Sequence, residues 1–345
     1  MKNANKVSRS FQHMILLCGC LLIYYSVSAR QHKPTESGYI AQKTQGIDSD
    51  YVLIFNSYSE SAPWCRSLVD STVMDLIKLS PQTMTVTQNL NSGLLRDEKA
   101  LAQLRQQVDV SYHDKPRMII YIGSTSWPFL HETIEKKWGK VPSIIFSDID
   151  YTGPIANLLR KTPIAPALRI PYDKIVKEYE GALSVVYMPI YLRQSLALMH
   201  QLTPPMTELC FISDTRWISA QMRADMAAIT KTDFPELKVR YLISADMSTL
   251  DLLDSLQHYG QETGVLFFSW LKQSQVGDSF INDSHFRTII SKSARQPLFV
   301  LNDNEVNTDS DVLGGYFPTR AAVSHHIRLA LEKTLAGQPG SFQTV

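Results

Sequence analysis

Residues 118–127 read Met-Ile-Ile-Tyr-Ile-Gly-Ser-Thr-Ser-Trp, an apolar run that stops at Gly123 and gives way to small polar side chains. A continuous apolar run of this length is typical of a strand that is buried on both faces. Strands are buried on both faces when helices cover a parallel sheet, so the run predicts an α/β fold. The polar residues then follow the carboxyl end of the strand, where open parallel sheets bind ligands.

The same alternation extends in both directions from this stretch. Short apolar or alternating runs predict nine strands, and amphipathic spacing between them predicts eight helices. The strands are expected at 51–55, 83–91, 118–122, 143–146, 185–188, 209–212, 239–243, 265–268 and 298–301, and the helices near 62–79, 97–110, 127–137, 191–202, 216–231, 250–259, 286–293 and 319–335. A chain of this length exceeds one hydrophobic core, so we expect two doubly wound parallel-sheet lobes joined by a hinge.

The domain boundaries follow from an interruption in this alternation of strands and helices. Prolines at 154, 163, 166 and 171 are incompatible with helix interiors and central strands. We therefore expect a first lobe over 50–160, a crossover at 161–182, a second lobe over 183–314, a return of 315–338 to the first lobe and a tail at 339–345.

The amino-terminal residues are typical of an export signal. Lys2, Lys6 and Arg9 precede the apolar run Met14–Val27, and small residues end it at Ala29. This predicts a cleaved signal peptide over 1–29, a flexible leader over 30–49 and a periplasmic location. Two alternatives stay open. One is an uncleaved anchor from Phe11 to Ala29, and the other is lipidation at Cys20.

Charge and cysteine content limit the partners and cofactors. Residues 1–29 hold three of the 34 basic residues and none of the 33 acidic ones, so the exported chain is nearly neutral. It has no basic stripe, which argues against nucleic acid as a partner. Cys65 and Cys210 lie far apart, in neither a disulfide nor a metal-binding pattern. We expect no metal, no cofactor and two buried or semi-buried thiols.

Polar and aromatic residues cluster after the expected strands, and four of the five tryptophans are among them. Such side chains provide the stacking area and directional hydrogen bonds that small-molecule sites use. We therefore predict a ligand-binding cleft between the lobes. Its candidate residues are Ser57, Tyr58, Trp64, Ser124, Trp127 and Asp148 in the first lobe, and Asp214, Trp217, Trp270 and Asp303 in the second.

Two further patterns suggest a site but lack essential residues. Asn302–Asp311 is rich in Asp and Asn, but it lacks the glycine and closing glutamate of an EF-hand loop. The pair His325-His326 resembles a histidine-kinase phosphoacceptor box, yet the acid and the Thr-Pro step are missing. No P-loop, nucleophile elbow or metalloprotease motif is present, so we predict no catalytic residues and no enzyme activity.

The ordered series of segments resembles a known group of proteins. The segments are 52–58, 116–127, 196–214, 265–270 and 314–318. Together they resemble the type I periplasmic-binding-protein-like modules of the ABC-transporter substrate-binding family. The likeness is strongest to the extracytoplasmic sensors of Bacteroidetes-type (hybrid) histidine kinases. It spans about residues 50–337. In that architecture a final segment returns to the second lobe, so a chain ending at Val345 is expected to be truncated or part of a longer protein.

The resemblance implies reversible capture of a small extracytoplasmic ligand. It favours signal input to a membrane-bound kinase, in cis or in trans, and it allows a homodimer. The alternative that it leaves open is a free periplasmic carrier that delivers substrate to an ABC permease.

Overall fold

The computed structural model describes residues 50–345 except 60–61, 204, 274–279, 282–285 and 303–310; the side chains of 63–64, 273, 280–281 and 286–288 also lie outside the description. The predicted signal peptide and leader fall outside the described residues. The two lobes below belong to one unit that extends to Val345. Among the described residues, no helix combines the length and the apolar character needed to span a bilayer.

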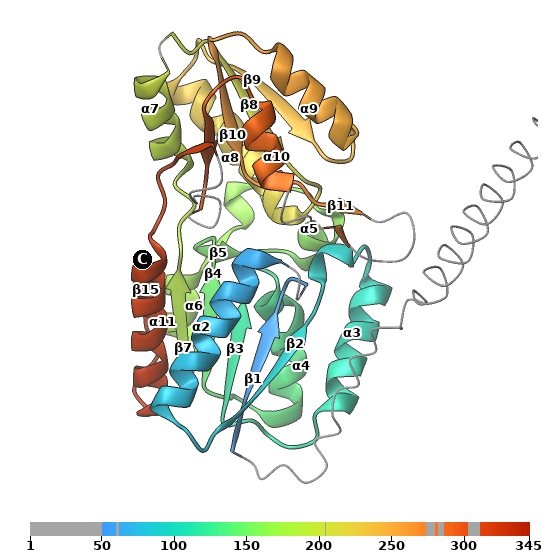
Figure 1. The fold of residues 1–345 in the computed structure, drawn as a ribbon. Helices are drawn as coiled ribbons and strands as arrows, with labels where there is room; N and C mark the ends of the chain where they lie inside the picture. Colours follow the sequence, from blue (N-terminus) through green and yellow to red (C-terminus); the bar gives the residue numbers. More distant parts are fainter. Residues whose placement is uncertain (1–49, 60–61, 204, 274–279, 282–285, 303–310) are drawn as a thin grey trace, which may run out of the picture. The chain divides into compact units, whose positions relative to one another are not determined.

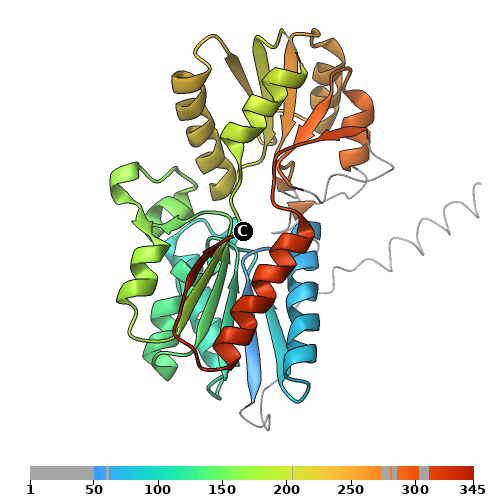
Figure 2. The ribbon, with the colours of Figure 1, turned by 90° about the vertical axis from the view of Figure 1, so that its left-hand side faces the viewer.

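The first lobe is built on a six-stranded sheet in the order β15-β7-β4-β3-β1-β2, and every neighbouring pair is parallel. Helices α2 and α11 cover one face, and α3, α4 and α6 cover the other (Figures 1 and 2). The elements are β1 (Tyr51–Asn56), α2 (Pro63–Leu79), β2 (Met84–Asn89), η1 (Ser92–Leu94), α3 (Glu98–Ser111), β3 (Met118–Ile122), α4 (Ser126–Trp138), β4 (Ser143–Ser147), α6 (Tyr172–Glu178), β7 (Leu183–Tyr187), α11 (Arg320–Leu335) and β15 (Phe342–Thr344).

The second lobe has a five-stranded parallel sheet in the order β14-β13-β10-β8-β9. Helices α7 and α8 pack on one face, and α9 and α10 pack on the other. The elements are α7 (Leu192–Leu202), β8 (Glu208–Ser213), α8 (Trp217–Asp233), β9 (Lys238–Ile243), α9 (Thr249–His258), β10 (Thr263–Phe267), β11 (Lys272–Gln273), β12 (Phe280–Ile281), α10 (Phe286–Ser293), β13 (Leu298–Val300) and β14 (Val312–Gly314).

Burial explains why these runs form central strands. Every residue of β1, β3 and β4 is buried, so side chains on both faces of the sheet contribute to the core. Edge strands β2 and β9 expose part of their residues, in keeping with their alternating sequences. The prediction of two doubly wound parallel-sheet lobes is confirmed.

The structure corrects the expected start of the second lobe. Residues 183–187 form β7, which pairs with β4 in the first sheet. The proline-rich residues before it are therefore a detour within the first lobe and not the crossover. They form β5 (Tyr151–Thr152), α5 (Ile155–Arg160), η2 (Pro166–Leu168) and β6 (Ile170–Pro171). Because a short buried apolar run satisfies either sheet equally well, its sequence did not show which sheet it would join.

The structure also corrects the expected tail. Residues 342–344 form β15, which pairs with β7 at the edge of the first sheet. Gly340 permits this pairing because a Cβ at that position would lie 2.0 Å from the carbonyl oxygen of Leu183. Only a residue without a side chain allows so close an approach of two backbones.

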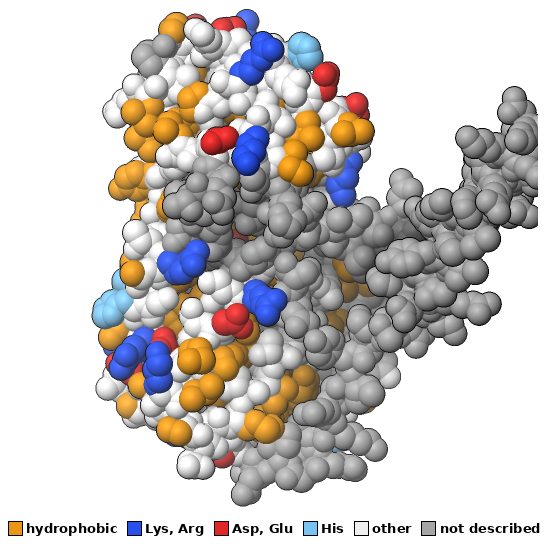
Figure 3. Space-filling model, viewed as in Figure 1, with side chains coloured by type: hydrophobic (Ala, Val, Ile, Leu, Met, Phe, Trp, Pro, Cys, Tyr) orange, Lys and Arg blue, Asp and Glu red, His pale blue; other side chains and the backbone are white. Residues whose placement is uncertain are grey.

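Two short segments connect the lobes in the described part of the chain. One runs from β7 to α7 through residues 188–191, and the other runs from β14 to α11 through residues 315–319. On the face shown in Figure 3, Lys and Arg side chains are interspersed with Asp and Glu and do not form a stripe.

Candidate functional site

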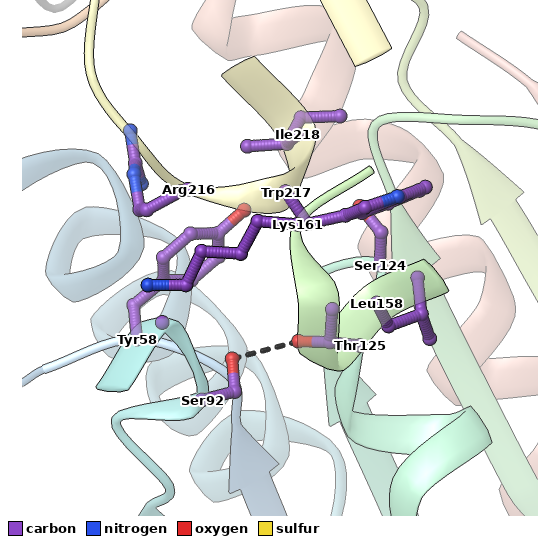
Figure 4. Close-up of a pocket in the computed structure, with 10 residues that line it drawn as sticks. Tyr58, Ser92, Ser124, Thr125, Leu158, Lys161, Arg216, Trp217 and Ile218 are labelled. Atoms are coloured by element: carbon purple, nitrogen blue, oxygen red, sulfur yellow. Dashed lines mark hydrogen bonds between the residues drawn. The ribbon is translucent and has the colours of Figure 1, made fainter. Parts of the chain in front are cut away.

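Three loops of the first lobe meet at the carboxyl edge of its sheet. Tyr58 follows β1, Ser92 follows β2, and Ser124 and Thr125 follow β3. The parallel register aligns Asn56 with both Asn89 and Ile122, so these loops leave the sheet at the same level. Ser92 Oγ and Thr125 Oγ1 are hydrogen-bonded at 2.7 Å (Figure 4). The candidate site is therefore a product of strand register and not of one local motif.

The second lobe closes over this edge with the start of α8. Arg216 precedes the helix, and Trp217 and Ile218 form its first turn. Together with Leu158 and Lys161 from the end of α5, they complete a cavity lined by both lobes (Figure 4). We call this space the cleft cavity.

The cleft cavity is small in the present arrangement. A water-sized sphere can occupy about 30 Å³ of it. That is room for one or two waters, whereas small-molecule sites enclose about 300–1,000 Å³. A ligand of ordinary size can therefore enter only when the lobes or α5 move apart.

Asp214 organises the side of the cavity that the second lobe contributes. Its side chain is fully buried, and it accepts hydrogen bonds from Arg216 N at 2.9 Å, Arg216 Nε at 2.8 Å and Ser219 Oγ at 2.6 Å. Burial alone would lower the pKa of Arg216, but Asp214, with smaller contributions from Tyr58 and Cys65, raises it above its ordinary value. Asp214 does not line the cavity; it fixes the position of Arg216, which does.

Tyr58 and Asp148 form the corresponding group in the first lobe. The Tyr58 hydroxyl donates to Asp148 Oδ2 at 3.3 Å, and Ser124 Oγ donates to Oδ1. Burial raises the pKa of Asp148, while the hydrogen bond from Ser124 acts against this shift. Burial and then Asp148 hold the pKa of Tyr58 well above its usual range, so the phenol stays protonated. The Arg216 guanidinium lies 5.6 Å from the centre of the Tyr58 ring.

Ser57 supports the site without lining it. It is buried, and its Oγ accepts a hydrogen bond from Ser126 N at 2.9 Å. Its carbonyl oxygen accepts from Ser92 Oγ at 2.7 Å. These bonds hold the loops after β1, β2 and β3 together.

Trp127, Trp217 and Trp270 are all buried, and Trp217 shares an apolar cluster with Trp127 but also lines the cleft cavity. Trp217 lines the cleft cavity, and its Nε1 donates to the carbonyl oxygen of Thr162 at 3.1 Å. Trp127 stacks on His131 with ring centres 4.0 Å apart and lies in the core of the first lobe. Trp270 is buried in the core of the second lobe. The structure brings neither Trp127 nor Trp270 to the cleft cavity.

Two predicted site residues cannot be placed. Trp64 belongs to the first turn of α2, but its side chain lies outside the description. Asp303 lies outside the described residues altogether.

Four cavity residues that carry polar groups escaped the sequence analysis: Ser92, Thr125, Lys161 and Arg216. Ser92, Thr125 and Arg216 each follow an expected strand within a few residues, so the strand-end rule that selected Ser124 would also have found them. Lys161 had no such signal. It ends a short helix in the proline-rich segment, and only the packing of α5 against α8 brings it to the site.

A second and larger cavity lies beside the β7–α7 connection. It is about 390 Å³ in volume and has Tyr151, Arg169, Tyr191 and Asp225 among its walls. In the wall of this cavity, Arg169, the residue after η2, forms an ion pair of 3.0 Å with Asp225 of α8. Because this second cavity lies next to the β7–α7 connection, movement of the lobes would change its volume.

Comparison with known proteins identifies the fold. No protein-family model and no curated protein sequence matches the chain. An ABC transporter solute binding protein from Agrobacterium vitis with bound allitol is 9% identical, with a TM-score of 0.51; the match covers 86% of this chain and 94% of that one. An uncharacterized protein from Actinobacillus succinogenes is 10% identical, with a TM-score of 0.51 and coverage of 86% and 96%.

Identities this low establish architecture and not function. The neighbours are two-lobed proteins related to periplasmic binding proteins, and both sheets of this chain share their parallel, doubly wound build. The chain therefore has the fold of the type I periplasmic-binding-protein-like modules.

Proposed function

We propose that the chain reversibly binds a small extracytoplasmic ligand between its two lobes and that closure of the lobes is the output. The observation that carries the proposal is the cleft cavity, which lies at the carboxyl edges of both sheets and takes walls from both lobes. Ligands of open α/β sheets bind at this edge. The solute binding protein of the same fold from Agrobacterium vitis holds allitol.

The hinge gives binding a mechanical consequence. Ligand contacts with Tyr58 and Ser124 on one side and with Trp217 on the other exist together only when the lobes are closed. A ligand shifts an open–closed equilibrium in proportion to its difference in affinity for the two states. Contacts that span the cleft supply this difference, and residues 188–191 and 315–319 are the segments that would bend.

We assign this output to signalling, with the chain as the periplasmic ligand-sensing input of a histidine kinase. The resemblance of its sequence segments to kinase sensor modules supports this use. The alternative is a carrier for an ABC permease, which the likeness to a solute binding protein favours. In neither use does the proposal require a catalytic residue.

A ligand screen tests the binding function. Sugars, polyols, amino acids, nucleosides and small carboxylates are added to the exported chain, and its Tm is measured. A ligand that binds only the native state stabilises it by about 2.7 kcal/mol at a hundredfold excess over Kd. Trp217→Ala should abolish the shift. Trp270→Ala, which removes an equally large side chain away from the cavity, should retain it. A ligand shift that survives Trp217→Ala would place the binding site elsewhere.

A second experiment separates the sensor from the carrier. Once a ligand is known, cells lacking the protein are assayed for ligand-induced transcription and for uptake of labelled ligand. Loss of the transcriptional response with uptake intact supports the sensor. Loss of uptake with the response intact supports the carrier and overturns the signalling assignment.

A further inference from the structure

Lys161 occupies an unusual position in the cleft cavity. It caps the carboxyl end of α5 with φ = 56°, one of two residues other than glycine with positive φ in the described chain. A left-handed backbone is unfavourable for residues with a Cβ, and such strain is concentrated at functional sites. Figure 4 shows the Lys161 side chain extending across the cavity past the ring of Tyr58.

The ammonium group of Lys161 has no ion-pair partner within 4 Å among the described residues, although the charge of Asp214 acts on it. Lys161 forms no ion pair with any of them, whereas Lys137 and Lys140 pair with Asp109 and Glu180 on the surface. Burial and then nearby Arg96 lower the pKa of Lys161, and Asp214 offsets only part of this effect. A half-buried cation of this kind gains from a bound anion.

Arg216 lines the same cavity and has unused hydrogen-bond donors. Its Nε is bonded to Asp214, but neither terminal nitrogen donates to a described residue. The Arg216 side chain is only 15% exposed, so a ligand that bonds to these donors is largely shielded from water. Two parallel N–H groups of a guanidinium match the two oxygens of a carboxylate.

The remaining walls add polar donors and apolar surface but no acid. Ser92, Ser124 and Thr125 contribute hydroxyl groups, while Leu158 and Ile218 contribute aliphatic surface. No Asp or Glu is among the described residues that line the cavity. Helix α8 also begins there without a side-chain cap, so the partial positive charge of its amino-terminal end faces the same space.

We infer that the ligand carries a carboxylate that is bound between Lys161 Nζ and the terminal nitrogens of Arg216. The apolar part of the ligand lies against Trp217 and Ile218. Asp214 already pairs with Arg216, whereas Lys161 has no ion pair among the described residues, so a ligand carboxylate would supply the charge that Lys161 lacks. The inference rests on the proposed function, because it names the chemistry of a ligand for the same cavity.

Carboxylates and their neutral amides test the inference. Butyrate, benzoate and phenylacetate are titrated into the full exported chain, each beside butyramide, benzamide or phenylacetamide, with inorganic phosphate and sulfate as further probes. Calorimetry gives the Kd, and a change in tryptophan fluorescence that is lost in Trp217→Ala reports on the cavity. We expect at least one carboxylate to bind about tenfold or more tightly than its amide, because hydrogen bonds between charged groups contribute at least this much.

Variants of Lys161 test whether this residue causes the preference for carboxylates over amides. Lys161→Gln should weaken carboxylate binding about tenfold or more. Lys161→Arg should restore most of it. The control is Lys140→Gln, which removes a surface lysine that pairs with Glu180 and should leave Kd unchanged. Because Lys161 is half-buried and caps a short helix, the Tm of each variant is measured to confirm folding.

The outcomes separate this inference from the proposed function. If amides bind as tightly as carboxylates, or if only phosphate or sulfate binds, the carboxylate assignment is wrong. If the wider screen yields a neutral ligand whose affinity Lys161→Gln does not change, binding in the cleft stands and the carboxylate assignment falls. If no compound in either set binds, both proposals fail.

Discussion

Substitution of Gly123 by alanine tests how the first-lobe side of the cavity is built. Gly123 follows β3 with φ = +88°, where residues with a side chain are strained. A Cβ placed there would lie 2.6 Å from Tyr58 Cε2 and 2.8 Å from Ser57 Oγ. The added methyl group must therefore displace Tyr58, which lines the cleft cavity and donates to Asp148.

The expected magnitude has two parts. The positive φ costs about 1–2 kcal/mol for a residue with a Cβ, and overpacking costs about 1–3 kcal/mol. Gly123→Ala should therefore lower the free energy of unfolding by about 2–5 kcal/mol. Gly337→Ala is the control because Gly337 has φ = +67° and a Cβ added to it would meet no described atom within 4 Å. Gly337→Ala should show only the cost of the positive φ, about 1–2 kcal/mol.

Urea unfolding measures both variants, and calorimetry with an identified ligand measures binding. The loss of unfolded-state entropy on replacing glycine by alanine is common to both variants, so it cancels in their difference. That difference should be about 1–3 kcal/mol, with weaker ligand binding only in Gly123→Ala. Equal destabilisation of the two variants would show that the contacts with Tyr58 and Ser57 do not constrain the site.

Three further predictions concern other parts of the chain. Trp270→Ala should destabilise the protein by about 3–5 kcal/mol in urea unfolding, because Trp270 is buried in the core of the second lobe; a change in ligand affinity at unchanged stability would place it in the site instead. Burial raises the pKa of Cys210 from its ordinary value near 9 to about 12, so its stabilising contribution is complete below pH 9 and is lost as the pH rises toward 12. Unfolding of the wild type and Cys210→Ala across this range measures the loss, and rapid reaction of native Cys210 with a thiol reagent at pH 8 would contradict the burial. Amino-terminal sequencing of the exported protein should begin at Arg30, and a start at Met1 or Cys20 would support an anchor or a lipoprotein.

The sequence predicted the fold class because the pattern that reports it is local. Runs such as Met118–Ile122 are apolar on both faces, and only a parallel sheet with helices on both sides buries them fully. The rule that ligands bind beyond such strands also selected Tyr58, Ser124 and Trp217, which line the cleft cavity. These conclusions need the order of elements along the chain but no knowledge of how distant elements pack.

Sheet membership required the tertiary structure. Residues 183–187 and 342–344 are apolar or alternating runs that could pair with either sheet, and backbone contacts across long sequence separations decide their place. The environment of a tryptophan after a strand is equally non-local. Trp217 and Trp270 both follow strands of the second lobe. Trp217 contacts the residues after α5, whereas Trp270 is enclosed by the core of the second lobe.

Hydrophobic periodicity and strand-end chemistry, which are properties of neighbouring residues, therefore determined the α/β class, the two-lobed organisation and part of the site. The tertiary structure alone decided that β7 and β15 complete the first sheet, that Asp214 holds Arg216 at the cavity and that Lys161 lies opposite it. The physical reason is that charge pairing and burial depend on distances between segments that are remote in sequence, and only the packing of the lobes and α5 fixes those distances.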